Sequence, residues 1–456
     1  MTPLFFKRGD SLLATLLFAA FALAGWKVLG RPPSANFAAT LQSGLLTSIG
    51  APESAPAPNP ASKPAAQTKS RYEARFASAA PGQAVHAASV VELRDGSLRA
   101  VWFSGSREGA GDVTIQSAVL SNESGQWATE STVFNRATVQ RGLMRYVKKL
   151  GNPVIARATD GSLVLWMVNV SLGGWAGSSI TWARSADEGV SWSELRRLVT
   201  SPFLNISTLV KSPPVALEGG QTALPVYHEF VTKFAEVLRL DSGGQVVDKI
   251  RIPGSQTSLQ PVLLVQSPER SQIYMRSAGA PYVTTSKTAD AGKTWSPTVP
   301  TALPNPDSAV AGLVTVAGDT WLALNPAATG RGTLSLIKVN KGGRLETASS
   351  WYVEGDVSQK TTLARPDYAM RLGNELKASG ASEAQAQAYV GSAVRQLCRK
   401  DQCAQEFSYP YLLQSKDGYV HLVYTWNRTR IKHIRFDPRQ VFQAAKTGSI
   451  NAPISE

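Results

Sequence analysis

Several residues whose side chains can do chemistry stand in short stretches of the chain. The run YHEF carries His228 and Glu229, whose imidazole and carboxylate can each accept a proton. The run YTWNRTRIKH carries the Trp426 indole, which can stack, and the Asn427 amide, which can hydrogen-bond, and GNPV carries the Asn152 amide. The other polar candidates are Lys211, Asn305, Asp307, Asn325, Arg428 and Arg430.

Composition narrows the classes of partner and cofactor. The 456 residues include 47 Lys and Arg against 33 Asp and Glu, and a net charge of +14 favours polyanions such as acidic glycans, anionic lipid or nucleic acid. Nucleic acid is the least favoured, because the basic residues do not form one interleaved tract. The four histidines are scattered, and no phosphate-binding, dinucleotide or metal-ligand motif occurs, so no cofactor or metal is expected.

The N-terminal segment predicts export. Lys7 and Arg8 precede an apolar run over residues 11–26, which is typical of a cleaved signal peptide or an uncleaved membrane anchor within residues 1–30. Either alternative places the rest of the chain on the periplasmic or extracellular side, and an uncleaved segment would bind the membrane. Residues 31–70 are rich in Ala, Pro and Ser, which predicts an extended, unpacked linker.

The next part of the chain reads as short strands joined by glycine-containing turns. Asp-Gly pairs divide three apolar stretches, which predicts β-hairpins over residues 90–103, 158–170 and 412–426. A second repeat, [ST]-x-D-x-G-x-[ST]-W, occurs at residues 185–192 and 288–295. Its Asp187 and Asp290 are expected to hold turns, with the tryptophan between sheets.

Degenerate copies of this repeat lie at residues 121–127, 240–245 and 339–344. A spacing of roughly 50 residues suits one four-stranded blade per repeat. We therefore expect an all-β, six-bladed β-propeller over residues 71–440, followed by a tail at 441–456.

One segment, residues 367–400, breaks the strand pattern. It is rich in Ala, Gln and Glu, Ser382 and Gln385 fit a capping box, and Gly380 marks a break, so two short helices are expected. This insertion either covers one face of the propeller or decorates its solvent side. Cys398 and Cys403 are close enough in sequence to form a disulfide in an oxidising compartment, although two free thiols are the alternative.

The Asp-containing repeats, the Gly-rich turns and the segment order resemble the sialidase (neuraminidase) superfamily, in its bacterial branch with BNR or Asp-box repeats. The resemblance covers residues 80–437 and implies a sialidase-type propeller with exo-alpha-sialidase-like glycoside hydrolase activity. It also implies an arginine triad for the substrate carboxylate, a Tyr nucleophile activated by a Glu, and an Asp acid/base.

Five positions match that pattern. In FSGSREGAGD, the resemblance matches Arg107 with an arginine of the family pattern and Asp112, five residues further on, with its acid/base. QIYMRS supplies Arg276 and NPAATGRGTLSL supplies Arg331 as the second and third triad arginines. SYPYLLQSKDG aligns Tyr409 with the nucleophile.

Two positions depart from the pattern. His86 occupies the slot of the first triad arginine, and Gln260 occupies the slot of the glutamate that activates the tyrosine. A phenol with a pKa near 10 is a poor nucleophile at neutral pH without a base or a cationic field. Glu229 could supply the missing carboxylate, with His228 as another base.

The leading hypothesis is an exported, monomeric, sialidase-like glycoside hydrolase acting on acidic sugars or on envelope or extracellular polysaccharide. Arg276 and Arg331 would hold a carboxylate, Tyr409 would act at the anomeric carbon and Asp112 would transfer the proton. One alternative is a polysaccharide lyase that uses His86 or His228 with Tyr409 on a uronate. Another is a non-catalytic propeller that binds acidic glycans through Trp426 and its basic charge.

Overall fold

A computed structural model describes residues 8–29, 35–39, 72–201, 205–339, 345–355 and 362–440. The chain divides into two units, Met1–Ala35 and Asn36–Glu456. The first unit contains the helix α1 (Arg8–Leu29). Within the described ranges, no helix has both the length and the apolar character needed to cross a bilayer. The signal or anchor expected from the sequence stays a prediction.

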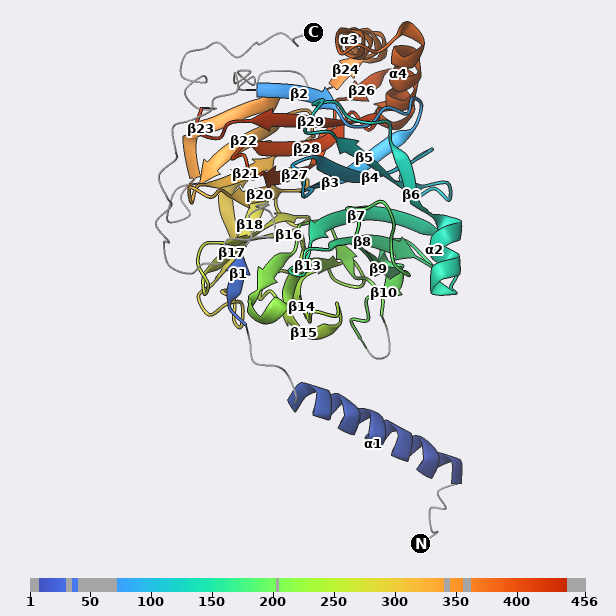
Figure 1. The fold of residues 1–456 in the computed structure, drawn as a ribbon, viewed down its shortest axis with the longest axis vertical. Helices are drawn as coiled ribbons and strands as arrows, with labels where there is room; N and C mark the ends of the chain where they lie inside the picture. The colour runs from blue at the N-terminus through green and yellow to red at the C-terminus, as the bar shows by residue number, and fades with distance from the viewer. Residues whose placement is uncertain are drawn as a thin grey trace. The chain divides into compact units, whose positions relative to one another are not determined.

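The described part of the second unit is mostly β, as expected, and contains six sheets of at least four antiparallel strands (Figure 1). The first three sheets are β3 (Ala84–Glu92), β4 (Leu98–Gly105), β5 (Thr114–Leu120) and β6 (Ser131–Asn135); β7 (Lys149–Arg157), β8 (Leu163–Val170), β9 (Ser178–Ser185) and β10 (Arg196–Arg197); and β12 (Val215–Leu217), β13 (Thr222–His228), β14 (Phe234–Leu240) and β15 (Val246–Arg251), joined by β1 (Phe37–Ala39) and β11 (Leu209–Val210).

The other three sheets follow in chain order. They are β16 (Ser258–Val265), β17 (Ser271–Ser277), β18 (Tyr282–Thr288) and β19 (Val299–Pro304); β20 (Ala311–Val314), β21 (Thr320–Leu324), β22 (Leu334–Val339) and β23 (Leu345–Glu354); and β27 (Phe407–Gln414), β28 (Val420–Trp426), β29 (Arg430–Phe436) and β2 (Tyr72–Phe76). The last sheet takes its outer strand from the N-terminal side of the domain, so its first and last segments are bonded together.

Neighbouring sheets contact each other through β3, β7, β16, β20 and β27, each of which lies at one edge of its sheet and which we term the leading strands. The third sheet makes these contacts through β11 and β13. β3 contacts β7, β7 contacts β11, β13 contacts β16, β16 contacts β20, β20 contacts β27, and β27 contacts β3 again. Because β11 pairs with β13, these contacts form a circuit through all six sheets. β3, β16 and β27 are buried along their whole length, and β7 is buried except at its two ends, because neighbouring sheets cover both faces of these strands.

The turns behave as the sequence predicts. The three Asp-Gly stretches form the hairpins β3–β4, β7–β8 and β27–β28. In the Asp-box after β9, Asp187 accepts from the Ser191 backbone at 2.9 Å and from the Ser185 hydroxyl at 2.7 Å. The Trp192 ring lies 6.2 Å from Phe134 of the preceding sheet, which confirms its packing between sheets. Of the degenerate copy at 339–344, residues 340–344 lie outside the described residues.

The expectation of an unpacked linker over residues 31–70 is wrong at one place. Phe37–Ala39 forms β1, which pairs with the edge strand β12. The Phe37 backbone donates to the Pro268 carbonyl at 2.9 Å and its ring is 2% exposed. A phenylalanine within the Ala/Pro/Ser-rich segment gains enough from burial to fix its neighbours onto an unpaired strand edge. Residues 31–34 and 40–70 of the linker lie outside the described residues.

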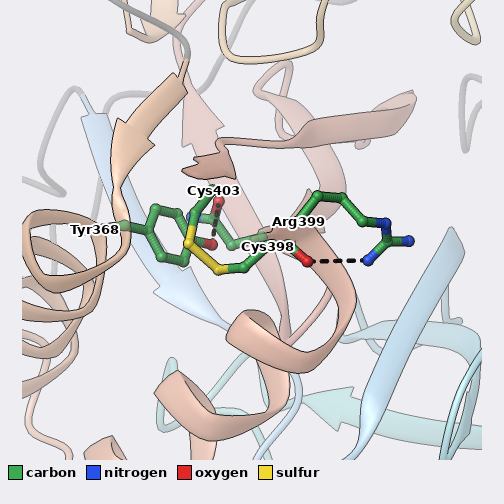
Figure 2. Close-up of a disulfide and its surroundings, with 5 residues drawn as sticks. Tyr368, Cys398, Arg399 and Cys403 are labelled. Atoms are coloured by element: carbon green, nitrogen blue, oxygen red, sulfur yellow. Dashed lines mark hydrogen bonds between the residues drawn. A yellow bond between two sulfur atoms is a disulfide. The ribbon is translucent and has the colours of Figure 1, made fainter. Parts of the chain in front are cut away.

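The insertion forms two helices, α3 (Arg365–Ala378) and α4 (Glu383–Leu397), and Ser382 and Gln385 make the predicted capping box. A small sheet consists of β24 (Thr362–Ala364), β25 (Cys398–Arg399) and β26 (Gln402–Ala404). β24 directly precedes α3, and β25 directly follows α4. The Cys398–Cys403 disulfide is formed within this sheet (Figure 2). Tyr368, Leu372, Leu376, Tyr389 and Ala393 pack into one core with the last sheet, so the helices are part of the domain's core and not a solvent-side decoration.

The Asp-box after β18 gives a test of the turn. Burial opposes ionisation of Asp290, but hydrogen bonds from Thr294 and Thr288 prevail and lower the pKa of its carboxyl. Its stabilising contribution is therefore present above about pH 4 and is lost as the pH falls further. We expect Asp290→Ala to lower the melting temperature at pH 7, and this deficit to shrink towards pH 3. Lys293→Ala, an exposed change in the same turn, is the control and should have little effect.

Candidate functional site

Four leading strands share a local distortion where the predicted site residues lie. A β-bulge shifts the pairing register of each of the strands β3, β7, β16 and β27 against its partner strand. One residue in each bulge has a left-handed backbone angle: Ala87, Asn152, Gln260 and Tyr409, with φ of 57°, 42°, 52° and 53°. Such bulges re-aim side chains at a cost in backbone strain of order 1 kcal/mol for each residue. The same distortion thus recurs in four sheets, at or next to residues that the sequence predicts for the site.

Three of the bulges bring Asn152, Gln260 and Tyr409 together with Tyr227 of β13, and we term these four residues the phenol cluster. The Gln260 amide nitrogen donates to the Tyr409 hydroxyl at 3.0 Å and lies 3.4 Å from the Tyr227 hydroxyl. The Asn152 amide donates to Tyr227 at 3.1 Å. Burial, with Tyr409 and Glu229 nearby, raises the pKa of Tyr227, which keeps this phenol neutral.

A buried lysine stands against the phenol cluster. The Lys211 ammonium donates to the Pro410 carbonyl, next to Tyr409, and lies 6.0 Å from the centre of the Tyr409 ring. Burial and the neighbouring Arg276 guanidinium lower the pKa of Lys211 to about 7. The buried amine therefore loses its proton more easily than an exposed lysine would, beside the Tyr409 ring.

Both predicted triad arginines are present at the site. Arg276 lies 3.2 Å from the Asp307 carboxylate, although its Nε is not aligned for a hydrogen bond. Burial opposes charge on Arg276, but Tyr409, Asp307, Tyr227 and Glu229 outweigh it and raise its pKa. Arg331 donates to the Asp307 carbonyl at 3.1 Å, so one loop contacts both guanidinium groups.

Glu406 connects Arg331 to a further arginine. Its carboxylate lies 3.6 Å from Arg331 Nη1 and accepts from Arg428 Nε at 2.9 Å. Arg428 Nη1 also donates to Glu108 at 2.9 Å. Burial opposes ionisation of Glu406, but Arg428 and Arg331 prevail and lower its pKa, so the carboxylate is charged.

His86 lies against the predicted nucleophile. Its ring centroid is 4.1 Å from that of Tyr409, and its Nδ1 is 2.9 Å from the Thr425 hydroxyl. Nε2 is buried without a hydrogen-bond partner among the described residues. Burial, with Arg428 and Arg331 nearby, lowers the pKa of His86 well below its usual range, so the imidazole is neutral.

The two charged residues of YHEF face different surroundings, because His228 is the last residue of β13 and Glu229 lies just beyond the strand. Glu229 is half-buried near Arg276, and burial raises the pKa of its carboxyl. His228 pairs with Glu236 at 3.1 Å and stacks on Phe234, with ring centroids 4.2 Å apart. These contacts give His228 a structural place, whereas Glu229 stands close to the site.

The loop over residues 105–112 places its charged residues differently from the sequence expectation. Both oxygens of Asp112 accept from Ser106, at 3.0 Å from its backbone nitrogen and 3.0 Å from its hydroxyl. Asp112 and Arg107 are exposed, while Glu108 between them reaches Arg428. Asp112 holds the turn in this conformation, and its role in proton transfer stays a prediction.

The run YTWNRTRIKH is only partly available to a ligand. Trp426 is 1% exposed and packs edge-on against Phe76, so its ring cannot stack on a sugar in this conformation. Asn427 is buried, and its side-chain oxygen accepts from Tyr368 and from the Glu406 backbone. The other polar candidates are also engaged within the protein. Asn325 donates to the Phe407 carbonyl, and Asn305 accepts from the Ser308 backbone. The Arg430 guanidinium lies over the rings of Phe76 and Tyr389.

Sequence reasoning missed three members of the site: Tyr227, Glu108 and Glu406. Tyr227 stands beside the singled-out His228, and strand alternation could have drawn attention to it. No signal in the sequence distinguishes Glu108 or Glu406 from the other glutamates of the chain. The described residues contain no group of three or more side chains suited to a metal ion.

The chain belongs to the family of BNR repeat-like domains, whose pattern matches residues 96–422. No curated protein sequence matches it at a significant level.

Solved sialidase structures share the fold at low identity. The Hadza microbial sialidase Hz136 aligns with a TM-score of 0.57 at 14% identity, over 78% of this chain and 66% of its own. The NanB sialidase from Streptococcus pneumoniae aligns with a TM-score of 0.56 at 9% identity, over 82% and 71%. The intramolecular trans-sialidase from Ruminococcus gnavus aligns with a TM-score of 0.54 at 12% identity, over 78% and 95%. This chain thus has a sialidase-like fold and spans about two thirds of the Hz136 chain.

Lys211 yields a prediction on stability. Its pKa is about 7 in the folded protein and about 10.4 in an unfolded chain, so the unfolded state binds more protons between these values. Stability should therefore rise with pH across this window, and Lys211→Met should remove part of that rise. The measurement is the free energy of unfolding in urea for both proteins from pH 6.5 to 9.5. We expect the value for the variant minus the value for the unmodified protein to decrease as the pH increases. A difference that stays constant with pH would contradict a buried, titrating amine.

Proposed function

We propose that this protein is an exported sialidase-like glycoside hydrolase that cleaves an acidic sugar from a glycan or polysaccharide. In this proposal the six sheets are the blades of a β-propeller, and the circuit of leading strands surrounds the site. The observation that carries the proposal is the placement of Tyr409 with Arg276, Arg331 and Lys211, which come from different sheets and loops. The sialidase-like neighbours support glycan as the substrate class.

Recognition of a carboxylate rests on the guanidinium groups. Arginine can bind a carboxylate through two parallel hydrogen bonds, which gives both strength and orientation. Arg276 and Arg331 share the Asp307 loop as a support, so their positions relative to each other are coupled. An acidic monosaccharide unit would be held with its anomeric carbon towards the Tyr409 hydroxyl.

Activation of the phenol must work without the usual glutamate. Gln260 can donate to the Tyr409 oxygen but cannot take its proton. A hydrogen-bond donor and the cations Lys211 and Arg276 stabilise negative charge on that oxygen as it develops. Lys211, when neutral, or Glu229 would accept the proton, and Asp112 is retained as the proposed acid for the leaving group.

A polysaccharide lyase is the second candidate, and one contact favours it. The neutral His86 ring lies against Tyr409, which is a base and acid pair of the kind that β-elimination from a uronate needs. A lyase product contains a new carbon-carbon double bond conjugated to a carboxylate and absorbs in the ultraviolet, whereas a hydrolase product does not. Absorbance during digestion of uronate polymers separates the two reactions.

Replacement of Tyr409 tests whether the protein is an enzyme. We expect Tyr409→Phe to abolish release of a fluorescent leaving group from a sialoside, with binding of the acidic product retained, because only the hydroxyl is lost. Tyr411→Phe, on the same strand, is the matched control. Binding of acidic glycan by the unmodified protein with no turnover of sialosides or uronates would instead identify a non-catalytic glycan-binding protein.

Gln260→Glu offers a gain of function. The substituted carboxylate would lie about as close to the Tyr409 hydroxyl as the amide nitrogen does now, 3.0 Å, and could take its proton. A positioned general base contributes about 100-fold or more to a rate. We expect sialoside turnover to rise at least about tenfold near neutral pH, measured as kcat, with Asn152→Asp as the control substitution in the same cluster. An unchanged rate would indicate that Tyr409 is not the attacking group.

A further inference from the structure

The position of the first triad arginine is filled by a residue that cannot replace it. His86 is 3% exposed, bonded to Thr425 and neutral, so it offers one nitrogen and no positive charge to a carboxylate. A site for an acidic sugar with only Arg276 and Arg331 would lack part of its charge. A cation near His86 could compensate.

Arg428 stands in that region and is partly open. Its backbone carbonyl accepts from the backbone nitrogen of Val85, the neighbour of His86, at 3.1 Å, and Glu406 links its side chain to Arg331. Its ion pairs use Nε and Nη1, and Nη2 takes part in neither. The side chains of Arg428 and Arg331 are 21% and 25% exposed, so both can meet a ligand.

We infer that Arg428 supplies the third guanidinium of the carboxylate site and that the α3–α4 insertion positions it. The inference rests on the proposed acidic-sugar function and adds a residue and a device that the family pattern does not contain. Arg428 is a substrate-binding residue in this scheme, and the insertion acts through it.

The turn that carries Arg428 is strained and is held by the insertion. Asn427 and Arg428 both have left-handed backbone angles, with φ of 47° and 52°, which costs of order 1 kcal/mol each. Tyr368 of α3 donates to the Asn427 side chain at 3.2 Å. From α4, Gln396 donates to the Arg428 carbonyl at 3.2 Å, and the Tyr389 carbonyl accepts from Thr429 at 3.1 Å.

The disulfide closes the same support. It joins the end of α4 to β26, which immediately precedes Gln405 and the Arg428 partner Glu406. Tyr368 and Cys403 belong to the same buried core, and Figure 2 shows both in the surroundings of the disulfide. The bond thus ties the end of α4, whose Gln396 bonds the Arg428 carbonyl, to the strand that leads to Glu406.

The first experiment measures binding by the full-length protein and its variants. The probes are 2,3-didehydro-2-deoxy-N-acetylneuraminic acid and trigalacturonate, with tri-N-acetylglucosamine as the neutral comparison. We expect Arg428→Gln to weaken binding of the acidic probe about tenfold or more, as Arg276→Gln does, because each removes a charged hydrogen bond. Arg371→Gln, an exposed change on α3, should stay within about twofold.

The outcomes separate the two proposals. Binding of an acidic probe that Arg276→Gln weakens and Arg428→Gln leaves unchanged overturns the inference and keeps the proposed function. Failure of the unmodified protein to bind either acidic probe overturns the proposed function and, with it, the inference. Arg428→Lys, which keeps the charge but not the planar fork, should recover part of the lost affinity.

The second experiment tests positioning by the insertion. Tyr368→Phe keeps the ring in the core and removes only the hydrogen bond to Asn427. We expect weaker binding of the acidic probe by about threefold or more, with the melting temperature nearly unchanged. Gln396→Leu should act in the same direction. Unchanged acidic-probe affinity in both variants, with the folded structure intact, would refute the positioning role.

Discussion

The site depends on one buried carboxylate that keeps two guanidinium groups together. Glu406 is 8% exposed, accepts from Ser408 and Arg428, and lies within ion-pair distance of Arg331. Two like charges so close would repel, and a buried anion without partners would be costly. Each charge is tolerable only because the others are present. The loops that carry Arg331, Glu406 and Arg428 are therefore constrained as one group.

The backbone bears a second cost at the same place. Tyr409, Gln260, Asn152 and Ala87 adopt left-handed angles at bulges in leading strands, where regular pairing would be easier. The surrounding sheets outweigh this strain because their strands are buried on both faces. The bulges bring polar side chains from distant parts of the chain close together. Gln260 and Tyr409 are 149 residues apart in sequence, yet their polar atoms lie within hydrogen-bond distance.

Much of the fold is predictable because it rests on local signals. The Asp-Gly turns and the Asp-boxes specify hairpins through side chains that bond their own turns, and the capping box at Ser382 and Gln385 begins α4 as expected. The packing of Phe37 was not predictable, because its partner strand and Pro268 are more than 170 residues away. Trp426 was misjudged for the same reason, since only the assembled core shows that its ring is covered.

The sequence by itself determined the β-rich class and the places of the turns, because repeats are local in the chain. It also proposed Tyr409, Arg276 and Arg331 as site residues, from motifs that are equally local. Only the tertiary structure decided which charges meet. In the folded protein Lys211 lies beside Tyr409, and Arg428 is bonded to Glu108 and Glu406. His228 is bonded to Glu236. Charge pairing in a buried site depends on distances between segments that are remote in sequence, and no local pattern encodes those distances.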